Sequence, residues 1–265
     1  MITTQILNEL KPDIRQLVLD NPVFFSKKPK TLLGVTNSKT IKGEKNGYLT
    51  GILHLSPADS VTEQTLCPYA EIAGCKDGCL YTAGRGKFNS VHMARVRKTI
   101  FYLFYRNEFM PVLANDISKL QRKANRDGLT LAIRLNGTSD IQWEHERFIS
   151  SDGTGYNNVF EAFPNIQFYE YTKIPTRKAP KNYHLTFSYS DRPEYAKVVA
   201  KSEAKNPTRN IAVVFNGELP TTYRNRTVIN GDKTDLRFLD KDNVIVGLTA
   251  KGKAKQDTSG FVVKL

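Results

Sequence analysis

All three cysteines of this 265-residue chain lie in one short segment, CPYAEIAGCKDGC, at residues 67–79. They are Cys67, Cys75 and Cys79, with the spacing C-x7-C-x3-C. Thiolates bind soft or borderline metals, above all zinc and the iron of iron–sulfur clusters. In a reducing compartment, clustered cysteines indicate metal or redox chemistry rather than disulfide bonds. The segment therefore predicts a metal centre.

Two kinds of metal centre are compatible with three thiolates. Three cysteines hold three irons of a [4Fe–4S] cluster and leave the fourth open to a ligand, and a [3Fe–4S] cluster needs only three. Gly74 and Gly78 each precede a cysteine and let the backbone wrap closely around a bulky core. A Cys3His zinc site is the alternative, with His54 or His92 as fourth ligand. Nearby basic residues that favour thiolates are Lys76, Arg85, Lys87 and Arg95.

The composition is that of an ordinary globular protein with a strong positive charge. Hydrophobic residues make up 40% and charged residues 25%, and 39 Lys and Arg against 26 Asp and Glu give a net charge of +13. This charge favours an anionic partner such as nucleic acid, a nucleotide or phosphate, although a basic soluble surface explains it equally well. We find no secretory leader and no apolar run of membrane-spanning length, so we expect a cytoplasmic protein with no membrane partner.

Strand and helix patterns alternate along most of the chain and must position the cysteines. We expect an N-terminal extension at 1–45, with a helix near 5–19 and a loop from 37 to 47, followed by a single domain at 46–265. Two amphipathic helices follow the first strand, a helical piece lies near 143–149, and another helix covers 192–204. Six strands are expected at 48–56, 129–137, 166–173, 183–190, 210–217 and 244–252.

The alternation predicts an α/β fold with parallel strands, either an open doubly wound sheet or a partial (β/α)6 TIM-like barrel with helices outside. In both, ligands bind at the carboxyl ends of the strands, and the cysteine segment follows the first of them. Polar residues after the other strands are candidate contacts to a small-molecule or nucleotide-like ligand, although turn formation also explains them. The candidates are Asn136, Asp140, Ser188, Asn216, Asp232, Arg237 and Lys251.

Three cysteines after the first strand of a six-unit β/α barrel resemble the organisation of the radical SAM superfamily. The resemblance implies a [4Fe–4S] cluster and S-adenosylmethionine as cofactor. The sequence departs from the superfamily pattern at two places, since the usual spacing is C-x3-C-x2-C and NGTSD stands at 136–140 where Gly-Gly-Glu is expected. These departures weigh against S-adenosylmethionine binding more than against cluster binding.

Several ordered blocks of sequence resemble a family of phage proteins, the gene product eighty-eight type. They include the cysteine segment with its flanks, RLNGTSDIQWE, FYEYTK, NYHLTFSYS and AVVF, and together cover roughly residues 32–263. The resemblance implies a viral or proviral protein in the host cytoplasm, with a radical-SAM-like barrel and a cluster on the three cysteines.

Three functions stay open at this point. The first is an iron–sulfur enzyme with radical SAM chemistry, and the second is a redox or structural cluster protein that does not use S-adenosylmethionine. The third is a basic nucleic-acid-binding protein with a Cys3His zinc site. A hydrolase is disfavoured, because the sequence contains no G-x-S-x-G motif.

Overall fold

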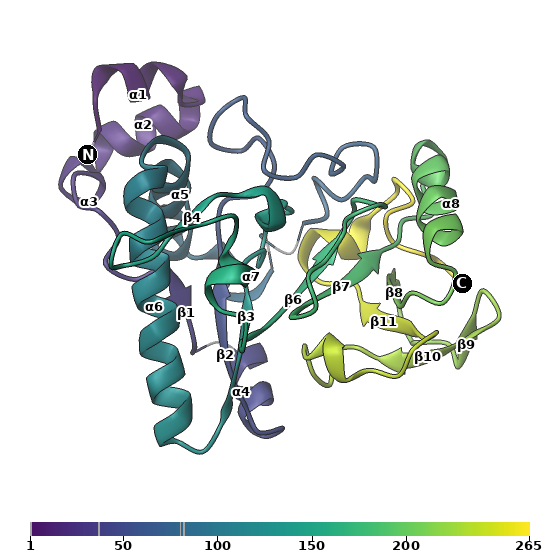
Figure 1. Ribbon diagram of the computed structural model, residues 1–265. Coiled ribbons are helices and arrows are strands. Elements are labelled where there is room, and N and C mark those ends of the chain that lie inside the picture. The colour runs from purple at the N-terminus through teal and green to yellow at the C-terminus, as the bar shows by residue number, and fades with distance from the viewer. Residues whose placement is uncertain (1, 37, 80, 82) are drawn as a thin grey trace.

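The computed structural model describes residues 2–36, 38–79, 81 and 83–265 and has a mixed α/β fold (Figure 1). One large sheet of nine strands runs through it, in the order β1-β2-β3-β6-β7-β8-β11-β10-β9. Its strands are β1 (Leu33–Gly34), β2 (Tyr48–Leu53), β3 (Thr130–Arg134), β6 (Gln167–Thr172), β7 (Tyr183–Ser188), β8 (Ile211–Phe215), β9 (Thr222–Tyr223), β10 (Arg226–Asn230) and β11 (Ile245–Thr249). A separate pair joins β4 (Phe148–Ile149) and β5 (Gly155–Tyr156).

The six expected strands are confirmed as β2, β3, β6, β7, β8 and β11. They are neighbours in the sheet in the order of the chain, and every adjacent pair is parallel. β10 adds a further parallel strand beside β11, whereas β1 and β9 pair antiparallel at the two edges. The sheet is therefore large, mostly parallel and open at its edges.

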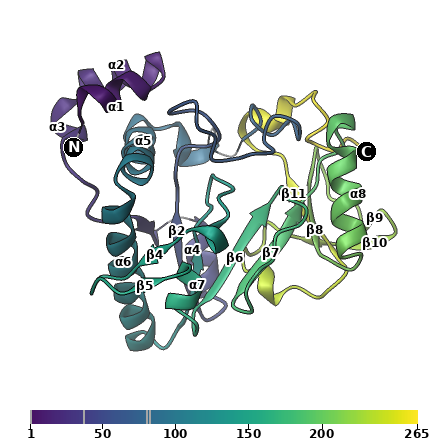
Figure 2. The ribbon, with the colours of Figure 1, turned by 45° about the horizontal axis from the view of Figure 1, so that its top comes forward.

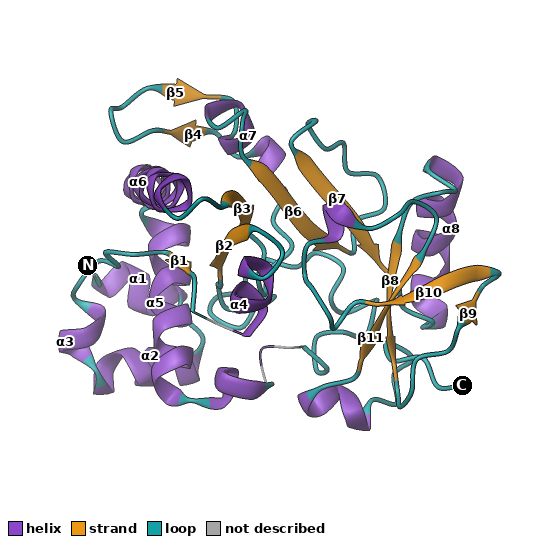
Figure 3. Ribbon diagram, turned by 90° about the horizontal axis from the view of Figure 1, so that it is seen from below, coloured by secondary structure: helices purple, strands orange, loops and turns teal. Residues whose placement is uncertain are grey.

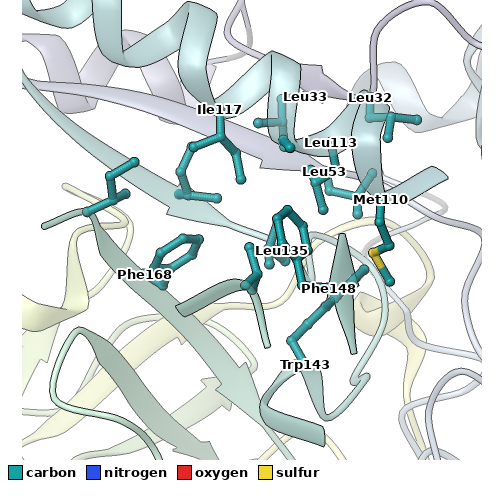
Figure 4. Close-up of a cluster of buried hydrophobic side chains, with 14 of the residues drawn as sticks. Leu32, Leu33, Leu53, Met110, Leu113, Ile117, Leu135, Trp143, Phe148 and Phe168 are labelled. Carbon is teal, nitrogen blue, oxygen red and sulfur yellow. The ribbon is translucent and has the colours of Figure 1, made fainter. Parts of the chain in front are cut away.

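Helices cover the convex side of this sheet at both ends (Figure 3). The two expected helices after β2 are confirmed as α5 (Asn89–Phe104) and α6 (Arg106–Arg126), and the later one as α8 (Ala196–Lys205), which follows a 3-10 turn at Pro193–Tyr195. Under α6 lies the main apolar core, where Leu113 and Ile117 face Leu53, Leu135 and Phe168 (Figure 4). No helix in the described part of the chain is both long and apolar enough to cross a membrane.

Helices do not cover every crossover of the sheet. A loop at 173–182 joins β6 to β7, and it contains Pro175 and Pro180, which cannot donate helical hydrogen bonds. The connection from β8 to β11 consists of β9, β10 and a 3-10 turn at Arg237–Leu239. Between β3 and β6 only the short α7 (Val159–Ala162) forms, and the helical piece expected near 143–149 is a single 3-10 turn followed by β4.

The N-terminal part also differs from expectation. Pro12 starts a new helix, so the single expected helix is two, α1 (Thr4–Glu9) and α2 (Pro12–Asp20), followed by α3 (Pro22–Phe25). The loop expected at 37–47 was wrong, because α4 (Ser38–Glu44) forms there on the concave side of the sheet (Figure 3). Tertiary packing explains this helix, since its Gly43 lies directly against β2. The domain boundary at residue 45 stays a prediction.

The buried carboxyl group of Glu170 fills a gap in the sheet between β3 and β6. These strands pair over only two residue pairs, whereas β2 and β3 pair over five. Beyond the gap, the Glu170 side chain accepts hydrogen bonds from the backbone N–H groups of Leu135 and Asn136, at 2.6 and 2.8 Å. Its second carboxylate oxygen lies 3.8 Å from Nε of Arg134. The carboxylate therefore replaces backbone hydrogen bonds that the diverging strands cannot make.

The stability of this arrangement should depend on pH. Burial raises the pKa of Glu170 from its ordinary value of 4.5 to about 8. The folded state therefore retains a proton that the unfolded chain has lost, so the free energy of unfolding should fall as pH rises from about 5 to 8. Glu170→Gln keeps an acceptor oxygen but cannot titrate. We expect the difference in unfolding free energy between wild type and this variant to shrink across that range in urea titrations, and a constant difference would contradict the account.

Candidate functional site

The loop that carries the cysteines crosses the carboxyl edge of the sheet between β2 and α5 (Figures 1 and 2). Ends of other strands hold it in place. The backbone N–H of Asp140, after β3, donates to the carbonyl of Leu66 at 2.8 Å. The hydroxyl of Ser190, after β7, donates to the carbonyl of Ala73 at 2.7 Å. The expected placement of the cysteine loop at this edge is therefore confirmed.

The turn that presents Cys75 requires a glycine. Gly74 has a φ of +68°, a conformation that residues with a side chain rarely adopt. A Cβ at this position would also lie 2.4 Å from Oγ of Ser259, whose hydroxyl donates to the carbonyl of Gly74. The loop thus reaches the C-terminal segment of the chain through a contact that only glycine permits.

The three thiols are half-buried and form no disulfide bond. Sγ of Cys67 accepts a hydrogen bond from the backbone N–H of Ala58 at 3.3 Å and lies 4.0 Å from the carbonyl oxygen of Thr138. The thiol of Cys75 donates to the carbonyl of Ala70 at 3.6 Å. Backbone groups of the loop and of the β3 edge therefore surround the sulfur atoms.

Burial is the main influence on the charge state of the thiols. It raises the pKa of Cys67 and of Cys75, and that of Cys79 to about 12. The carboxylate of Asp140 raises the pKa of Cys67 and of Cys75 further, and neighbouring thiolates do the same for Cys67 and Cys79. Without a bound cation, all three sulfurs are therefore protonated at neutral pH.

Two cations, one of them buried, lie close enough to oppose this effect. The ammonium of Lys173, at the end of β6, lowers the pKa of Cys75, and the guanidinium of Arg95 on α5 lowers that of Cys79. Arg95 thus acts as the sequence predicted. Lys76 instead pairs with Asp59 at 2.8 Å, and the side chains of Arg85 and Lys87 lie outside the described residues.

Metal-binding geometry is not preformed in the described part of the chain. No three His, Cys, Asp or Glu side chains there lie close enough together to bind one metal ion. Of the two candidate fourth ligands, His92 accepts or donates a hydrogen bond with the hydroxyl of Tyr81, and His54 lines the cavity described next. The zinc and cluster assignments both stay predictions.

A cavity of about 810 Å³ lies on the concave side of the sheet, beside the cysteine loop. Two residues connect it to the thiols, because Arg95 and Thr138 line the cavity and also neighbour Cys79 and Cys67. Its volume falls in the range of small-molecule sites. Among the described residues, its charged lining consists of Lys42, Arg95, Lys98, Arg134, Asp232, Asp235 and Lys251.

Two of the seven predicted ligand contacts, Asp232 and Lys251, line this cavity and form an ion pair. Lys42 adds a hydrogen bond from Nζ to the carbonyl of Asp232 at 2.5 Å. Sequence reasoning did not single out Lys42, Lys98 or Arg134 as part of a site. For Arg134 a signal existed, because it is an arginine inside the otherwise apolar strand TLAIR.

The other predicted contacts lie outside the cavity lining. Asn136 organises the turn after β3, where its side chain bonds Ser139, Ile141 and Trp143. Arg237 is buried and pairs with Asp240 at 3.3 Å. Ser188 and Asn216 end their strands, and the carbonyl of Ser188 accepts a hydrogen bond from Lys173.

Asp140 belongs to a buried network of ion pairs centred on Arg177. The guanidinium of Arg177 lies 3.1 Å from Asp140 and forms a bidentate pair with Glu144, at 2.6 and 2.8 Å. It also donates to the hydroxyl of Tyr183 at 2.8 Å. Through these contacts Arg177 ties the loop after β6 to the turn after β3, next to the cysteine loop.

Comparison with known proteins identifies the family. A model of the family described as Gene product 88 matches residues 30–265, so the chain belongs to that family. This match confirms the resemblance to the phage gene product family that the sequence blocks indicated. Searches of curated proteins and of solved structures gave no match.

The Arg177 network should be a major source of stability. Arg177→Ala leaves two carboxylates buried without a partner, so we expect the free energy of unfolding to fall by about 3–5 kcal/mol. Chemical denaturation monitored by Trp143 fluorescence measures this loss. Arg126→Ala, which removes an exposed ion pair with Asp127, is the matched control and should change little. Equal effects of the two substitutions would contradict the structural role of Arg177.

Proposed function

We propose that this member of the Gene product 88 family binds an iron–sulfur cluster through Cys67, Cys75 and Cys79. The observation that carries the proposal is the position of the thiols, which lie at the carboxyl edge of a parallel sheet, next to residues that line a cavity of ligand size. In open α/β sheets and in barrels, ligands and cofactors bind at this edge.

The donor set fits such a cluster in number and in chemistry. Three soft sulfur ligands suit iron, and their raised pKa values mean that a bound cation must replace their protons. Lys173 and Arg95 supply positive charge that offsets the negative charge of a thiolate-ligated cluster. Three protein ligands would leave one iron of a [4Fe–4S] cluster without a protein ligand and able to bind another molecule.

The order of the strands supports a finer interpretation as a partial (β/α)6 barrel of the radical SAM type. Six consecutive parallel strands form a curved sheet, and the cysteine loop follows the first of them (Figure 3). A cluster of this class supplies single electrons and, with S-adenosylmethionine, begins radical chemistry. In this chain Asn136, Gly137 and Thr138 stand at the end of β3, so recognition of S-adenosylmethionine would rest on other groups than Gly-Gly-Glu.

Within this function the protein's own residues have definable tasks. Asp140 and Ser190 hold the cysteine loop against the strand ends, and Arg95 and Lys173 tune the charge near the sulfurs. The cavity would bind the molecule on which the cluster acts. Tyr195 and Phe261 cover the ammonium of Lys173 at 5.3 and 4.8 Å and shield this region from water.

Substitution of one cysteine should remove the cluster. We expect the anaerobically purified wild type to be brown and to bind about four iron atoms per chain, and Cys75→Ala to lose most of the iron and the thiolate-to-iron absorption. Asp77→Ala is the matched control, because Asp77 is exposed in the same loop. Iron retained in the Cys75 variant at the level of the control would refute the assignment of ligands.

Cleavage of S-adenosylmethionine separates the radical SAM interpretation from a cluster with another redox or structural role. With a reduced cluster, the radical interpretation predicts formation of 5′-deoxyadenosine, which chromatography detects. A cluster-loaded protein that forms none would leave the cluster assignment intact and remove the radical SAM interpretation. A colourless protein with one zinc per chain would instead support the Cys3His alternative.

A further inference from the structure

We propose that the cavity binds the phosphate group of a small phosphorylated organic molecule at Arg95 and Lys98. The inference concerns the cavity alone and does not depend on a cluster at the cysteines. It starts from the charges in the lining, where five basic side chains face two acidic ones among the described residues.

Two of the five cations are neutralised by carboxylates, since Arg134 pairs with Asp235 at 2.8 Å and Lys251 pairs with Asp232. Lys42, Arg95 and Lys98 donate to backbone carbonyls and form no ion pair with a carboxylate of the described residues. Arg95 and Lys98 lie together on α5, so most of the unpaired positive charge of the cavity is at one place.

The guanidinium of Arg95 is held in position but is not satisfied. It stacks over the ring of Tyr81 at 5.0 Å, and one Nη donates to the carbonyl of Tyr81 at 3.4 Å. Its Nε is buried without a hydrogen-bond partner among the described residues.

Lys98 lies one helical turn further along the same face of α5. Its ammonium donates to the carbonyl of Leu32 at 2.6 Å and has further N–H groups to offer. The carboxylate of Asp116 on α6 raises the pKa of Lys98. This carboxylate already accepts hydrogen bonds from the backbone N–H groups of Leu32 and Leu33, at 2.6 and 3.2 Å. Two cations with fixed positions thus face one cavity.

The start of α5 adds to this positive region. Ser90 and Val91 in its first turn line the cavity, followed by Ala94 and then by Arg95 and Lys98. Phe88 at the N-cap offers no side-chain acceptor to the helix, so the positive end of the helix dipole is uncompensated there. The lining beside it includes Ala83, Gly84 and Gly86, whose small size lets a ligand approach the backbone.

A phosphorylated organic molecule fits these groups better than a simple anion does. A phosphate dianion matches two cations, and its oxygens suit the planar donors of arginine. The lining also contains Asp232 and Asp235, whose carboxylates would accept hydrogen bonds from sugar hydroxyls or ring N–H groups. The volume of about 810 Å³ accommodates a sugar phosphate or a mononucleotide.

Calorimetric titration of the purified full chain tests the proposal, with inorganic phosphate, ribose 5-phosphate, AMP and adenosine as probes. We expect ribose 5-phosphate or AMP to bind about tenfold more tightly than inorganic phosphate or adenosine. Arg95→Gln and Lys98→Gln should each raise the Kd of that probe about tenfold. Arg122→Gln and Lys119→Gln, which are exposed on α6, are the matched controls and should leave it unchanged.

The pH dependence of binding gives a second measurement. Burial lowers the pKa of Lys98 to about 8, with Arg95 and Arg97 on its own helix adding to the effect and Asp116 on α6 opposing it. The Kd of the phosphate probe should therefore rise as pH increases from about 7.5 to 9.5, where phosphate itself stays dianionic. Lys98→Gln should remove this dependence.

Three results would overturn the proposal. They are no binding of any phosphorylated probe, equal binding by wild type and both cavity variants, and binding of inorganic phosphate as tight as that of the organic phosphates. Iron is measured in every sample, so that loss of a cluster near Cys79 is recorded separately from loss of phosphate binding.

Discussion

The parallel pairing of six consecutive strands is the constraint on which the rest of this structure depends. Because each of these strands runs in the same direction as its neighbours, the segments that follow them all emerge at one edge of the sheet. The cysteine loop, the turn after β3 and the Lys173 segment therefore meet there, although they are far apart in sequence. The hydrogen bonds of Asp140 and Ser190 to the loop are possible only because of this alignment.

The same sheet is interrupted at two places, and the first of them contributes to the site. β3 with β6 and β7 with β8 each pair over two residue pairs only, so the sheet opens into an arc rather than staying flat (Figure 3). At the first interruption Glu170 replaces missing backbone partners, and Arg134 beside it reaches Asp235 in the cavity lining. A flat, continuous sheet would offer no such concave surface. Burying charged groups beside the concave surface costs free energy unless each of them has a partner.

The period of the apolar residues and the spacing of turn-forming residues were sufficient to predict much of this architecture. All six parallel strands and both helices after β2 follow from apolar patterns and stop signals, because their packing faces are local properties of each segment. The position of the cysteine loop at the carboxyl edge followed from strand order alone. Helix α4 did not follow, since a polar, glycine-containing segment becomes helical only through its contact with β2.

Sequence reasoning predicted only some of the residues that form the site. Asp232 and Lys251 were identified as polar residues near strand ends, but the same rule selected Asn136 and Asp140, whose side chains are used within the protein. Lys98 lies on a helix and Arg134 within a strand, where local pattern alone does not separate a cavity-lining charge from a structural ion pair. Which charges already have partners is a property of the tertiary structure, and it decides what the cavity can bind.

The central claim is that the three thiols hold an iron–sulfur cluster beside this cavity. Iron and acid-labile sulfide in the anaerobically purified full chain test it most directly. The account predicts about four atoms of each per chain. A protein that carries stoichiometric zinc without sulfide, or that binds no metal even after anaerobic reconstitution, would contradict it.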